Sequence, residues 1–409
     1  MNQFTATTDA GLERLAAQRL QRLRDSMREH NTPVLLVLDS VNIQYATGAS
    51  NMTIFSTRTP ARYLLLFAEG PSILYEYFGC EHLAQNLATI DEVRPARGLC
   101  FVSSGGDPGT QAAAFAAEIA NAVVDAGLSI DSLAVDRFPF SAIDALRAQG
   151  FHLSDADAVF STARHIKLAG EIEVMREAMC RVIDASERMV ERIEPDSTEN
   201  EIWAEFIGPF IATEGKYIAT RLLQSGAHSF PYFQEAGARK VQAGELICFD
   251  TDAVGFAGYC VDFSRSYLCG DQPATAVQQD LYSKAREQLE HNVDLIRAGA
   301  VYRDIAQAAW PIPAAHQDSR YYCVGHGLGM SGEFPNIPHL SDNHLGADMP
   351  YPIEGAVEVG MVLCIESYIG CARSGQGIKL EDQLLITETG VERMSASAPF
   401  DERLMGRMF

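Results

Sequence analysis

Two pairs of acidic residues that lie inside apolar segments constrain this 409-residue chain more than any other feature. The segments LICFDTD (246–252) and YCVDFSRSYL (259–268) are rich in β-branched, aromatic and other apolar residues, which predicts two strands. Two glycines between them mark a turn, and a hairpin about that turn brings Asp252 close to Asp262. Asp250 and Asp252 are two residues apart, so we expect both to point to the same face of their strand.

A second pair of predicted strands repeats this arrangement. The segments MVLCIESYIG (361–370) and GIKLEDQLLIT (377–387) flank a short stretch rich in Gly, Arg and Ser. Glu366 and Glu381 lie equally far from the middle of that stretch, so a hairpin sets them opposite each other. Because directly opposed carboxylates repel, such a pair is stable when a cation lies between its members.

One histidine, His326, lies in a Gly-rich segment between the two strand pairs. Any one of these acids alone would more simply be a solvated surface group, but two facing pairs inside apolar strands favour a buried site. Oxygen ligands with one nitrogen suit divalent metals, and two such ions about 3.5–4 Å apart activate a bridging water.

We therefore expect two divalent metal ions (Fe, Mn, Co or Zn) at a hydrolytic or lyase centre. The expected ligands are Asp252, Asp262, His326, Glu366 and Glu381. Asp250 either binds a metal ion as well or supports a ligand.

The overall composition limits the partners and the compartment. The formal net charge is −22, which argues against nucleic-acid binding, because a nucleic-acid site needs a basic face. Nine cysteines are scattered without a CxxC pair, which indicates reduced thiols in a cytoplasmic protein. The N-terminal segment lacks the pattern of a signal peptide, and no apolar stretch is long enough to span a membrane. We expect a cytoplasmic protein that acts on a small molecule, with no nucleic-acid or membrane partner.

The length of the chain and the order of its patterns predict two domains. Residues 10–30 and 108–127 are expected helices and residues 32–39 an expected strand, an alternation that is typical of an α/β unit. All of the expected metal ligands come later in the chain. We therefore expect an N-terminal α/β domain over residues 1–163 and a catalytic domain over residues 164–409.

Five segments carry a family resemblance: RHIKLAGEIEVMREA (164–178), DTDAVGFAGYCVDFSRSY (250–267), VGHGLGMSGEFP (324–335), MVLCIESYIG (361–370) and IKLEDQLLITETG (378–390). Together they resemble the pita-bread superfamily, which includes aminopeptidase P, prolidase, creatinase and methionine aminopeptidase. The resemblance covers about the whole chain. It implies an α/β (α+β) fold with a creatinase-like N-terminal domain and a pita-bread metalloenzyme domain, and it implies the same five metal ligands. Members of this layout usually dimerise, and the N-terminal domain of one subunit closes the partner's site, so we expect a homodimer.

Two departures from the peptidase pattern bear on the reaction. Peptidases of this superfamily usually carry a histidine ahead of the first ligand strand, where this chain has Tyr232. They carry a second histidine before a glutamate in the loop that follows the ligand histidine, where this chain has Gly332 before Glu333. Those histidines help to bind the peptide and to move protons. Their absence counts against a standard Xaa-Pro peptidase.

A narrower resemblance is to the DddP-type dimethylsulfoniopropionate lyases. It is carried by NIQYATGASNM (42–52), RTPARYLLL (58–66), TRLLQSGAHSFPYFQE (220–235) and FDTDAVGFAGYCVDFSRS (249–266). It implies that Asp250 is also a metal ligand, and that the substrate is cleaved to dimethyl sulfide and acrylate. Where those lyases have a proposed aspartate base and a tryptophan, this chain has Gly332 and Phe55.

Each possible reaction points to further candidate residues for catalysis or substrate binding. For a lyase, the faces of aromatic rings would bind the sulfonium group of the substrate. For each aromatic residue alone, packing in the hydrophobic core is the simpler explanation. For a C–N hydrolase, acting on Xaa-Pro peptides or on a small solute as creatinase or ectoine hydrolase does, Arg221 could hold a substrate carboxylate or form a structural ion pair. A binding module without metal is a third reading. The catalytic candidates are Asp250, Glu333 and Tyr321, beside a metal-bound hydroxide. The substrate-binding candidates are Phe55, Arg221, Tyr232 and Phe233, and Tyr321 also belongs to the aromatic set.

Overall fold

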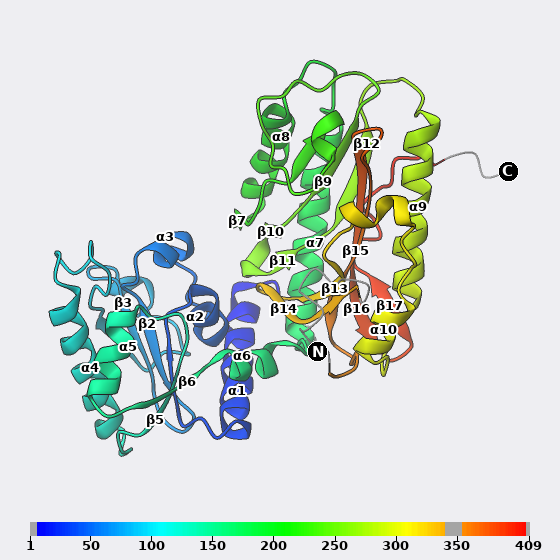
Figure 1. Ribbon diagram of the computed structural model, residues 1–409. Helices are drawn as coiled ribbons and strands as arrows, with labels where there is room; N and C mark the ends of the chain where they lie inside the picture. Colours follow the sequence, from blue (N-terminus) through cyan, green and yellow to red (C-terminus); the bar gives the residue numbers. More distant parts are fainter. Residues whose placement is uncertain (1–5, 340–353, 406–409) are drawn as a thin grey trace. The chain divides into compact units, whose positions relative to one another are not determined.

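The computed structural model describes residues 6–339 and 354–405 and divides the chain into two compact units, Met1–Arg164 and His165–Phe409 (Figure 1). The first unit is built on a six-stranded sheet with the order β4-β3-β2-β1-β5-β6. Its strands are β1 (Val34–Val37), β2 (Tyr63–Phe67), β3 (Ser72–Glu76), β4 (Glu92–Pro95), β5 (Ser132–Val135) and β6 (His152–Asp155). Its helices are α1 (Asp9–Glu29), α2 (Ser40–Thr47), α3 (Thr53–Arg58), α4 (Pro108–Asp125), α5 (Phe140–Ala148) and α6 (Asp157–Arg164).

The first unit is held together by strands that are buried on both faces. Strands β1, β2 and β3 are buried along their whole length, which explains their nearly continuous apolar sequences. The apolar side of α4 contributes Phe115 and Ile119 to one core cluster with Leu36, Leu65 and Leu133. The sheet is mixed, because β1 pairs antiparallel with β2 and parallel with β5. The predicted α/β character of this half is confirmed.

The second unit contains an antiparallel sheet with the order β14-β13-β15-β16-β12-β9-β8, to which β17 adds by pairing with β16. A small sheet has the order β11-β10-β7. The strands of the large sheet are β8 (Leu223–Ser225), β9 (Leu246–Asp250), β12 (Ser264–Leu268), β13 (Cys323–Leu328), β14 (Gly332–Pro338), β15 (Val362–Cys371), β16 (Gln376–Thr387) and β17 (Gly390–Arg393). The small sheet consists of β7 (Tyr217–Ile218), β10 (Ala253–Val254) and β11 (Cys260–Val261).

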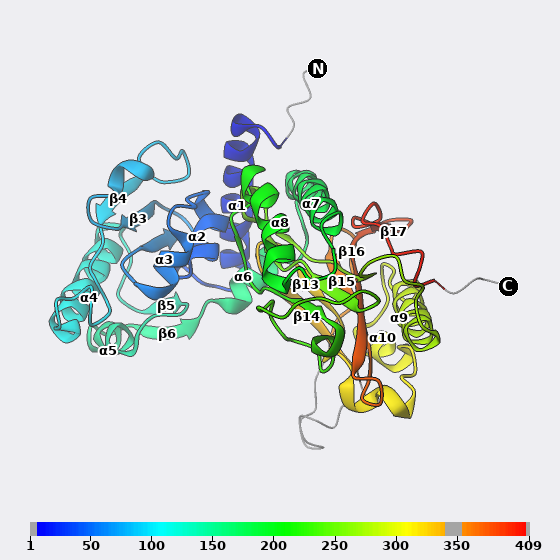
Figure 2. The same ribbon diagram turned by 90° about the horizontal axis from the view of Figure 1, so that it is seen from above.

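The helices of the second unit are α7 (Ala169–Val190), α8 (Glu199–Ala212), α9 (Ala276–Asp294) and α10 (Tyr302–Ala308). Helices α7 and α8 lie side by side, and α9 packs against β15 and β16 (Figure 2). In the part of the chain that the structure describes, no helix combines the length and the apolar character needed to cross a membrane.

The packing of α9 decides which residues of β15 and β16 reach the site. Ile365 and Leu380 belong to the same core cluster as Leu281 and Leu289 of α9. Because side chains alternate along a strand, the residues next to Ile365 and Leu380 point to the opposite face of the sheet. Glu366 and Glu381 are among them, so the apolar face fixes the register that the acids need.

The first predicted hairpin is correct in outline and wrong at its tip. Strand β9 ends at Asp250, whereas a strand to residue 252 was expected. Asp252 has a φ of 36°, so it leaves the strand, and the alternation rule does not apply to it. The expected strand 259–268 is likewise interrupted between β11 and β12. The hairpin itself forms, because Asp250 pairs with Ser264 in an antiparallel register.

Candidate metal centre

The second hairpin places its two acids as the sequence predicted. Glu366 on β15 and Glu381 on β16 are direct partners in the antiparallel register. Both side chains are fully buried, with relative exposures of 1% and 0%. A buried pair of opposed carboxylates is costly unless cations or protons compensate its charge. The local geometry therefore requires a positive charge or a proton at this point.

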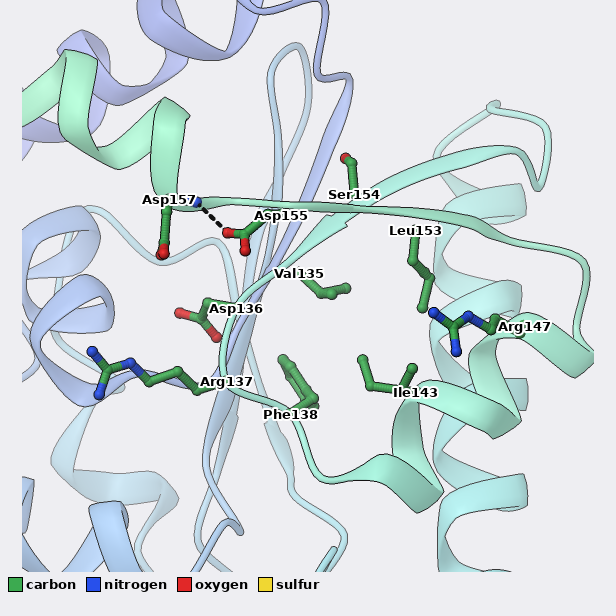
Figure 3. Close-up of a pocket in the computed structure, with 10 residues that line it drawn as sticks. All are labelled: Val135, Asp136, Arg137, Phe138, Ile143, Arg147, Leu153, Ser154, Asp155 and Asp157. Atoms are coloured by element: carbon green, nitrogen blue, oxygen red, sulfur yellow. Dashed lines mark hydrogen bonds between the residues drawn. The ribbon is translucent and has the colours of Figure 1, made fainter. Parts of the chain in front are cut away.

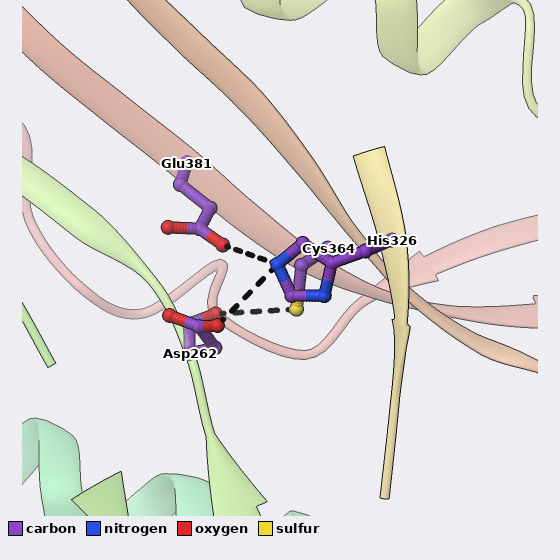
Figure 4. A group of neighbouring side chains, drawn as sticks. All are labelled: Asp262, His326, Cys364 and Glu381. Atoms are coloured by element: carbon purple, nitrogen blue, oxygen red, sulfur yellow. Dashed lines mark hydrogen bonds and ion pairs between the residues drawn. The ribbon is translucent and has the colours of Figure 1, made fainter. Parts of the chain in front are cut away.

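His326 and Asp262 converge on the same two glutamates. The His326 Nε2 atom lies 3.3 Å from Glu366 Oε1. It is 3.6 Å from Asp262 Oδ2 and 3.9 Å from Glu381 Oε1 (Figure 4). The other ring nitrogen, Nδ1, lies 3.1 Å from the carbonyl oxygen of Gly327. Since a carbonyl only accepts, Nδ1 donates the hydrogen bond, which leaves Nε2 as the ring nitrogen that faces the acids and that could bind a metal ion when it is deprotonated.

The two N-terminal acids of the group are held by hydroxyl groups. Tyr232 donates a hydrogen bond of 2.6 Å to Asp250 Oδ2, and Thr220 donates one to Asp252. The structure thus brings together five carboxylates, which we call the carboxylate cluster: Asp250, Asp252, Asp262, Glu366 and Glu381. Five of the six expected ligands form this cluster. The sixth, His326, lies 3.9 Å or less from three of its members.

Lys379 lies inside the carboxylate cluster and was not expected from the sequence. Its Nζ atom is 2.6 Å from Glu366 Oε2, 2.8 Å from Glu381 Oε2 and 3.4 Å from Asp250 Oδ2. The side chain is completely buried. The signal was present in the sequence, because residues two apart on β16 share a face and Lys379 precedes Glu381 by two.

The cluster fits two divalent cations by charge and by unsatisfied oxygen atoms. Five carboxylates and one lysine leave a deficit of four positive charges when the histidine is neutral, which two divalent ions would supply. Among the described residues, Asp250 Oδ1 and Glu381 Oε1 are buried oxygens without a hydrogen-bond partner. Buried carboxylate oxygens of this kind are expensive unless they are bound to a cation. Both observations agree with the donor set predicted for a two-metal site.

Without metal, the cluster retains protons. Burial and the charge of Glu381 raise the pKa of Asp262 well above its usual value, and burial and Glu366 do the same for Glu381. Burial and the charge of Asp250 raise the pKa of Asp252 to about 6. Burial alone would raise the pKa of Glu366, but Lys379 and His326 lower it to about 2. Burial would lower the pKa of His326, whereas Glu366 and Glu381 raise it to about 9.

These pKa values predict an opposite pH dependence for the metal-free and the metal-loaded protein. In the metal-free protein, Asp252 takes up a proton on folding between its unfolded pKa of about 3.9 and the folded value near 6, so stability falls as pH rises through that window. The contribution of His326 is present below its unfolded pKa of about 6.5 and is lost as pH rises towards 9. Metal binding needs deprotonated ligands, so the stabilisation by an added cation grows with pH.

Urea unfolding at about pH 5, 7 and 9, with a chelator and with a saturating divalent cation, measures both trends. Asp252→Asn should flatten the slope of the chelated protein below pH 6, because it removes the titrating group. A chelated protein that gains stability between about pH 5 and 9 would contradict the arrangement described for these residues.

Tyr232 and Tyr321 line one side of the cluster, and the half-exposed Phe233 packs against both of their rings; we call these three residues the aromatic wall. The ring of Tyr321 lies 5.3 Å from that of Phe233 and 5.7 Å from that of Tyr232. The Lys379 ammonium is 4.7 Å from the centre of the Tyr321 ring and 5.6 Å from that of Tyr232. A buried cation is thus already seated against these rings, which shows that their faces can accept positive charge.

One carboxylate fixes both ends of the loop that carries Tyr232 and Phe233. Glu199, at the start of α8, accepts hydrogen bonds from the backbone N–H groups of Ser225 and Gly237 at 2.9 and 3.0 Å. The Glu199 side chain is fully buried, and His228 also lies against it at 3.2 Å. The loop of residues 226–236 is therefore closed at its base by Glu199, a role that the sequence patterns did not reveal.

The remaining candidates have other partners. Glu333 forms an ion pair of 2.6 Å with Lys167, a residue of the linker segment, and both side chains are nearly buried. Arg221 is half-exposed and pairs with Glu235 at 3.4 Å, which is the structural alternative considered for it. Phe55 lies on α3 of the first unit, half-exposed, with its ring edge against Tyr77. The catalytic role of Glu333 and the substrate-binding roles of Arg221 and Phe55 stay predictions.

The first unit has a pocket of about 440 Å³ at the ends of β5 and β6 (Figure 3). Its charged side chains have partners within the unit. Arg137 pairs with Asp39 at 3.3 Å, and Asp155 accepts a hydrogen bond from the backbone of Asp157. Buried Asp136 accepts hydrogen bonds from the backbone of Leu38 and Asp39. We therefore assign the chemistry to the carboxylate cluster of the second unit.

An α/β unit followed by a unit with a buried cluster of acids and one histidine defines a metal-dependent enzyme of the lyase or hydrolase type. Comparison with known families agrees. Residues 173–388 match the model of metallopeptidase family M24, and residues 19–166 match that of the creatinase/prolidase N-terminal domain. The chain belongs to metallopeptidase family M24, whose members are dinuclear metalloenzymes, and the predicted creatinase-like and pita-bread architecture is confirmed.

The similar proteins include lyases and peptidases. The chain is 33% identical to the dimethylsulfoniopropionate lyase DddP of Roseovarius nubinhibens over 97% of this chain and 89% of that protein. It is 34% identical to the DddP of Roseobacter denitrificans over 98% of this chain and 90% of that protein. Among solved structures, the Xaa-Pro dipeptidase of Bacillus anthracis matches with a TM-score of 0.73 at 20% identity, covering 94% of this chain and 99% of that chain. That likeness shows the fold alone.

Proposed function

We propose that the protein is a metal-dependent lyase that cleaves dimethylsulfoniopropionate to dimethyl sulfide and acrylate. The observation that carries the proposal is the aromatic wall beside the carboxylate cluster, because a sulfonium, like an ammonium, is attracted to the face of an aromatic ring. The near-full-length similarity to two lyases of this name supports it. The hydroxyl of Tyr232, at the place of a peptidase histidine, is already engaged with Asp250.

Different residues of the chain would carry out different steps of the reaction. The rings of Tyr232 and Tyr321 would receive the dimethylsulfonium group. Two divalent ions held by the carboxylate cluster would supply Lewis acidity towards the substrate carboxylate. A base removes a proton from the carbon next to that carboxylate, the C–C double bond forms, and the C–S bond breaks with its electrons remaining on sulfur.

Asp250 is the base that the geometry favours. Of the candidates taken from the sequence, Glu333 is neutralised by its ion pair with Lys167. Asp250 is held through Oδ2 by Tyr232, which leaves Oδ1 without a hydrogen-bond partner among the described residues. This role belongs to the alternative in which Asp250 supports a metal ligand and Oδ1 carries no metal ion, so that this oxygen accepts the proton once substrate is bound.

The direct test is to incubate the protein, reconstituted with a divalent metal, separately with dimethylsulfoniopropionate and with Xaa-Pro dipeptides. We expect dimethyl sulfide and acrylate in equal amounts from the first, and no release of proline from the second. Proline release without dimethyl sulfide would reject the lyase and place the protein among the C–N hydrolases of its family. A preparation that binds metal and acts on neither substrate would also reject the proposal.

Gly332→Asp provides a second arm of this test. An added Cβ at Gly332 meets no atom within 4 Å, and its φ is not in the left-handed region, so an aspartate fits there without strain. If Asp250 is a weaker base than an aspartate at position 332 would be, the variant should release dimethyl sulfide about 100-fold faster, at the lower end of the range for general-base catalysis. Gly332→Asn is the matched control, because it adds nearly the same volume without a base.

A further inference from the structure

Cys364 is a thiol that lies among the acids of the metal centre. It precedes Glu366 by two residues on β15, so both side chains point to the same face of the sheet. It is the register partner of His326 on β13, and its side chain is fully buried. The Sγ atom, His326 and one oxygen each of Asp262 and Glu381 all lie within 4.8 Å of one another (Figure 4).

The nitrogen and oxygen donors of this group are spaced nearly as in a metal site. Metal–ligand bonds of about 2.0–2.3 Å in a tetrahedron separate neighbouring ligand atoms by about 3.3–3.8 Å. The His326 Nε2 atom is 3.6 Å from Asp262 Oδ2 and 3.9 Å from Glu381 Oε1. A slight contraction would bring these three donors onto one cation, and the Cys364 Sγ atom lies within 4.8 Å of each of them. Glu381 Oε1 is buried and has no hydrogen-bond partner among the described residues, as expected of an oxygen that binds a cation.

The thiol itself is weakly engaged. Its contact with the backbone oxygen of Asp262 is 3.8 Å, at the outer limit for sulfur. Cys248, an equally buried thiol on β9, differs in this respect, since it donates to the carbonyl oxygen of Gly377 at 3.2 Å and accepts from Ser266 at 3.3 Å. Binding a cation would therefore cost Cys364 little, whereas Cys248 has two good partners to lose.

We propose that Cys364 is a sulfur ligand of the metal centre, forming one mixed site with Asp262, His326 and Glu381. On binding, the S–H bond breaks, the sulfur bonds to the cation, and the proton passes to solvent. A thiolate among oxygen and nitrogen ligands favours Zn²⁺, Co²⁺ and Fe²⁺ over harder ions such as Mn²⁺ and Mg²⁺. The inference rests on the proposed metal centre but on no particular substrate.

Cobalt substitution tests it without an activity assay. The full-length protein is freed of metal and titrated with Co²⁺ while its visible and near-ultraviolet absorption are recorded. Visible ligand-field bands report bound cobalt, and a near-ultraviolet sulfur-to-cobalt band reports a thiolate ligand. We expect both in the unaltered protein and in Cys248→Ser, and only the visible bands in Cys364→Ser. Zn²⁺ affinity should fall at least about tenfold in Cys364→Ser, while Mn²⁺ affinity stays near its original value.

The unaltered protein alone can overturn the proposal, even if a variant fails to fold. Visible bands without the sulfur band would show that cobalt binds and that Cys364 does not ligate it. A sulfur band that persists in Cys364→Ser would assign it to another thiol. A failure to bind cobalt at all would reject the metal centre itself, an outcome that is separate from whether dimethyl sulfide is formed.

Discussion

Asp262→Asn is expected to release the metal ions and to lower turnover at least about a thousandfold. The substitution keeps the shape of the side chain but removes one of five negative charges, and Asp262 Oδ2 is one of the oxygens that face His326. Charge stabilisation by a metal ion contributes several kcal/mol, and each 1.4 kcal/mol changes a rate about tenfold. Elemental analysis of the dialysed protein and the initial rate of dimethyl sulfide release measure the two effects.

Glu392→Gln is the matched control for this experiment. Glu392 is also a carboxylate on a strand of the second unit, but it is exposed and pairs with Arg176 on the surface. It should keep its metal and its activity, since exposed ion pairs contribute little. An Asp262→Asn protein that is fully active and retains its metal would show that the carboxylate cluster does not hold the ions.

Lys379→Met is expected to destabilise the metal-free protein by about 3–5 kcal/mol, because it leaves buried carboxylates without their resident cation. Methionine has a similar length and no charge, so packing is largely retained. In the metal-loaded protein the loss should be smaller, since bound divalent ions then balance most of the charge. Urea unfolding with a chelator and with saturating cation separates the two states.

Lys379→Arg is the companion variant, because it keeps the positive charge. Its larger guanidinium group must fit a fully buried position. It should lose less stability than Lys379→Met in the presence of chelator. Equal stability of Lys379→Met and the unaltered protein without metal would mean that the cluster is neutralised by protons alone, and the role given to the ammonium would be wrong.

The parts of the site that were predicted from sequence depend on short-range periodicity. Glu366 and Glu381 were placed opposite each other because a symmetric hairpin leaves no other register for two apolar strands. The α/β character of the first half was predictable for the same reason, since β1 and β2 are continuous apolar runs. Periodicity failed at Asp252, where the chain turns out of its strand and the side-chain direction depends on tertiary contacts such as that with Thr220.

The parts that were not predicted depend on contacts between distant segments. In the sequence, Lys379 looks like one more polar strand residue. In the fold, β9 and β15 bring Asp250 and Glu366 to it, beside Glu381 of its own strand. The ion pair of Glu333 with Lys167 joins residues 166 positions apart, and no local pattern reveals it. In the sequence, Cys364 is one of several scattered cysteines. The site residues close to its thiol group come from other segments of the chain, so no local pattern distinguishes it.

The closure of loop 226–236 by Glu199 bears on how such a site can evolve. Glu199 holds both ends of the loop through backbone N–H groups, so these two contacts do not depend on which side chains lie between Ser225 and Gly237. The expected metal ligands lie outside this insert, on β9, β13, β15 and β16 or in the segments beside β9 and β12. A change at position 232 alters both the aromatic wall and the hydrogen bond to Asp250, so a few substitutions in this loop could change the substrate while the other expected ligands stay in place.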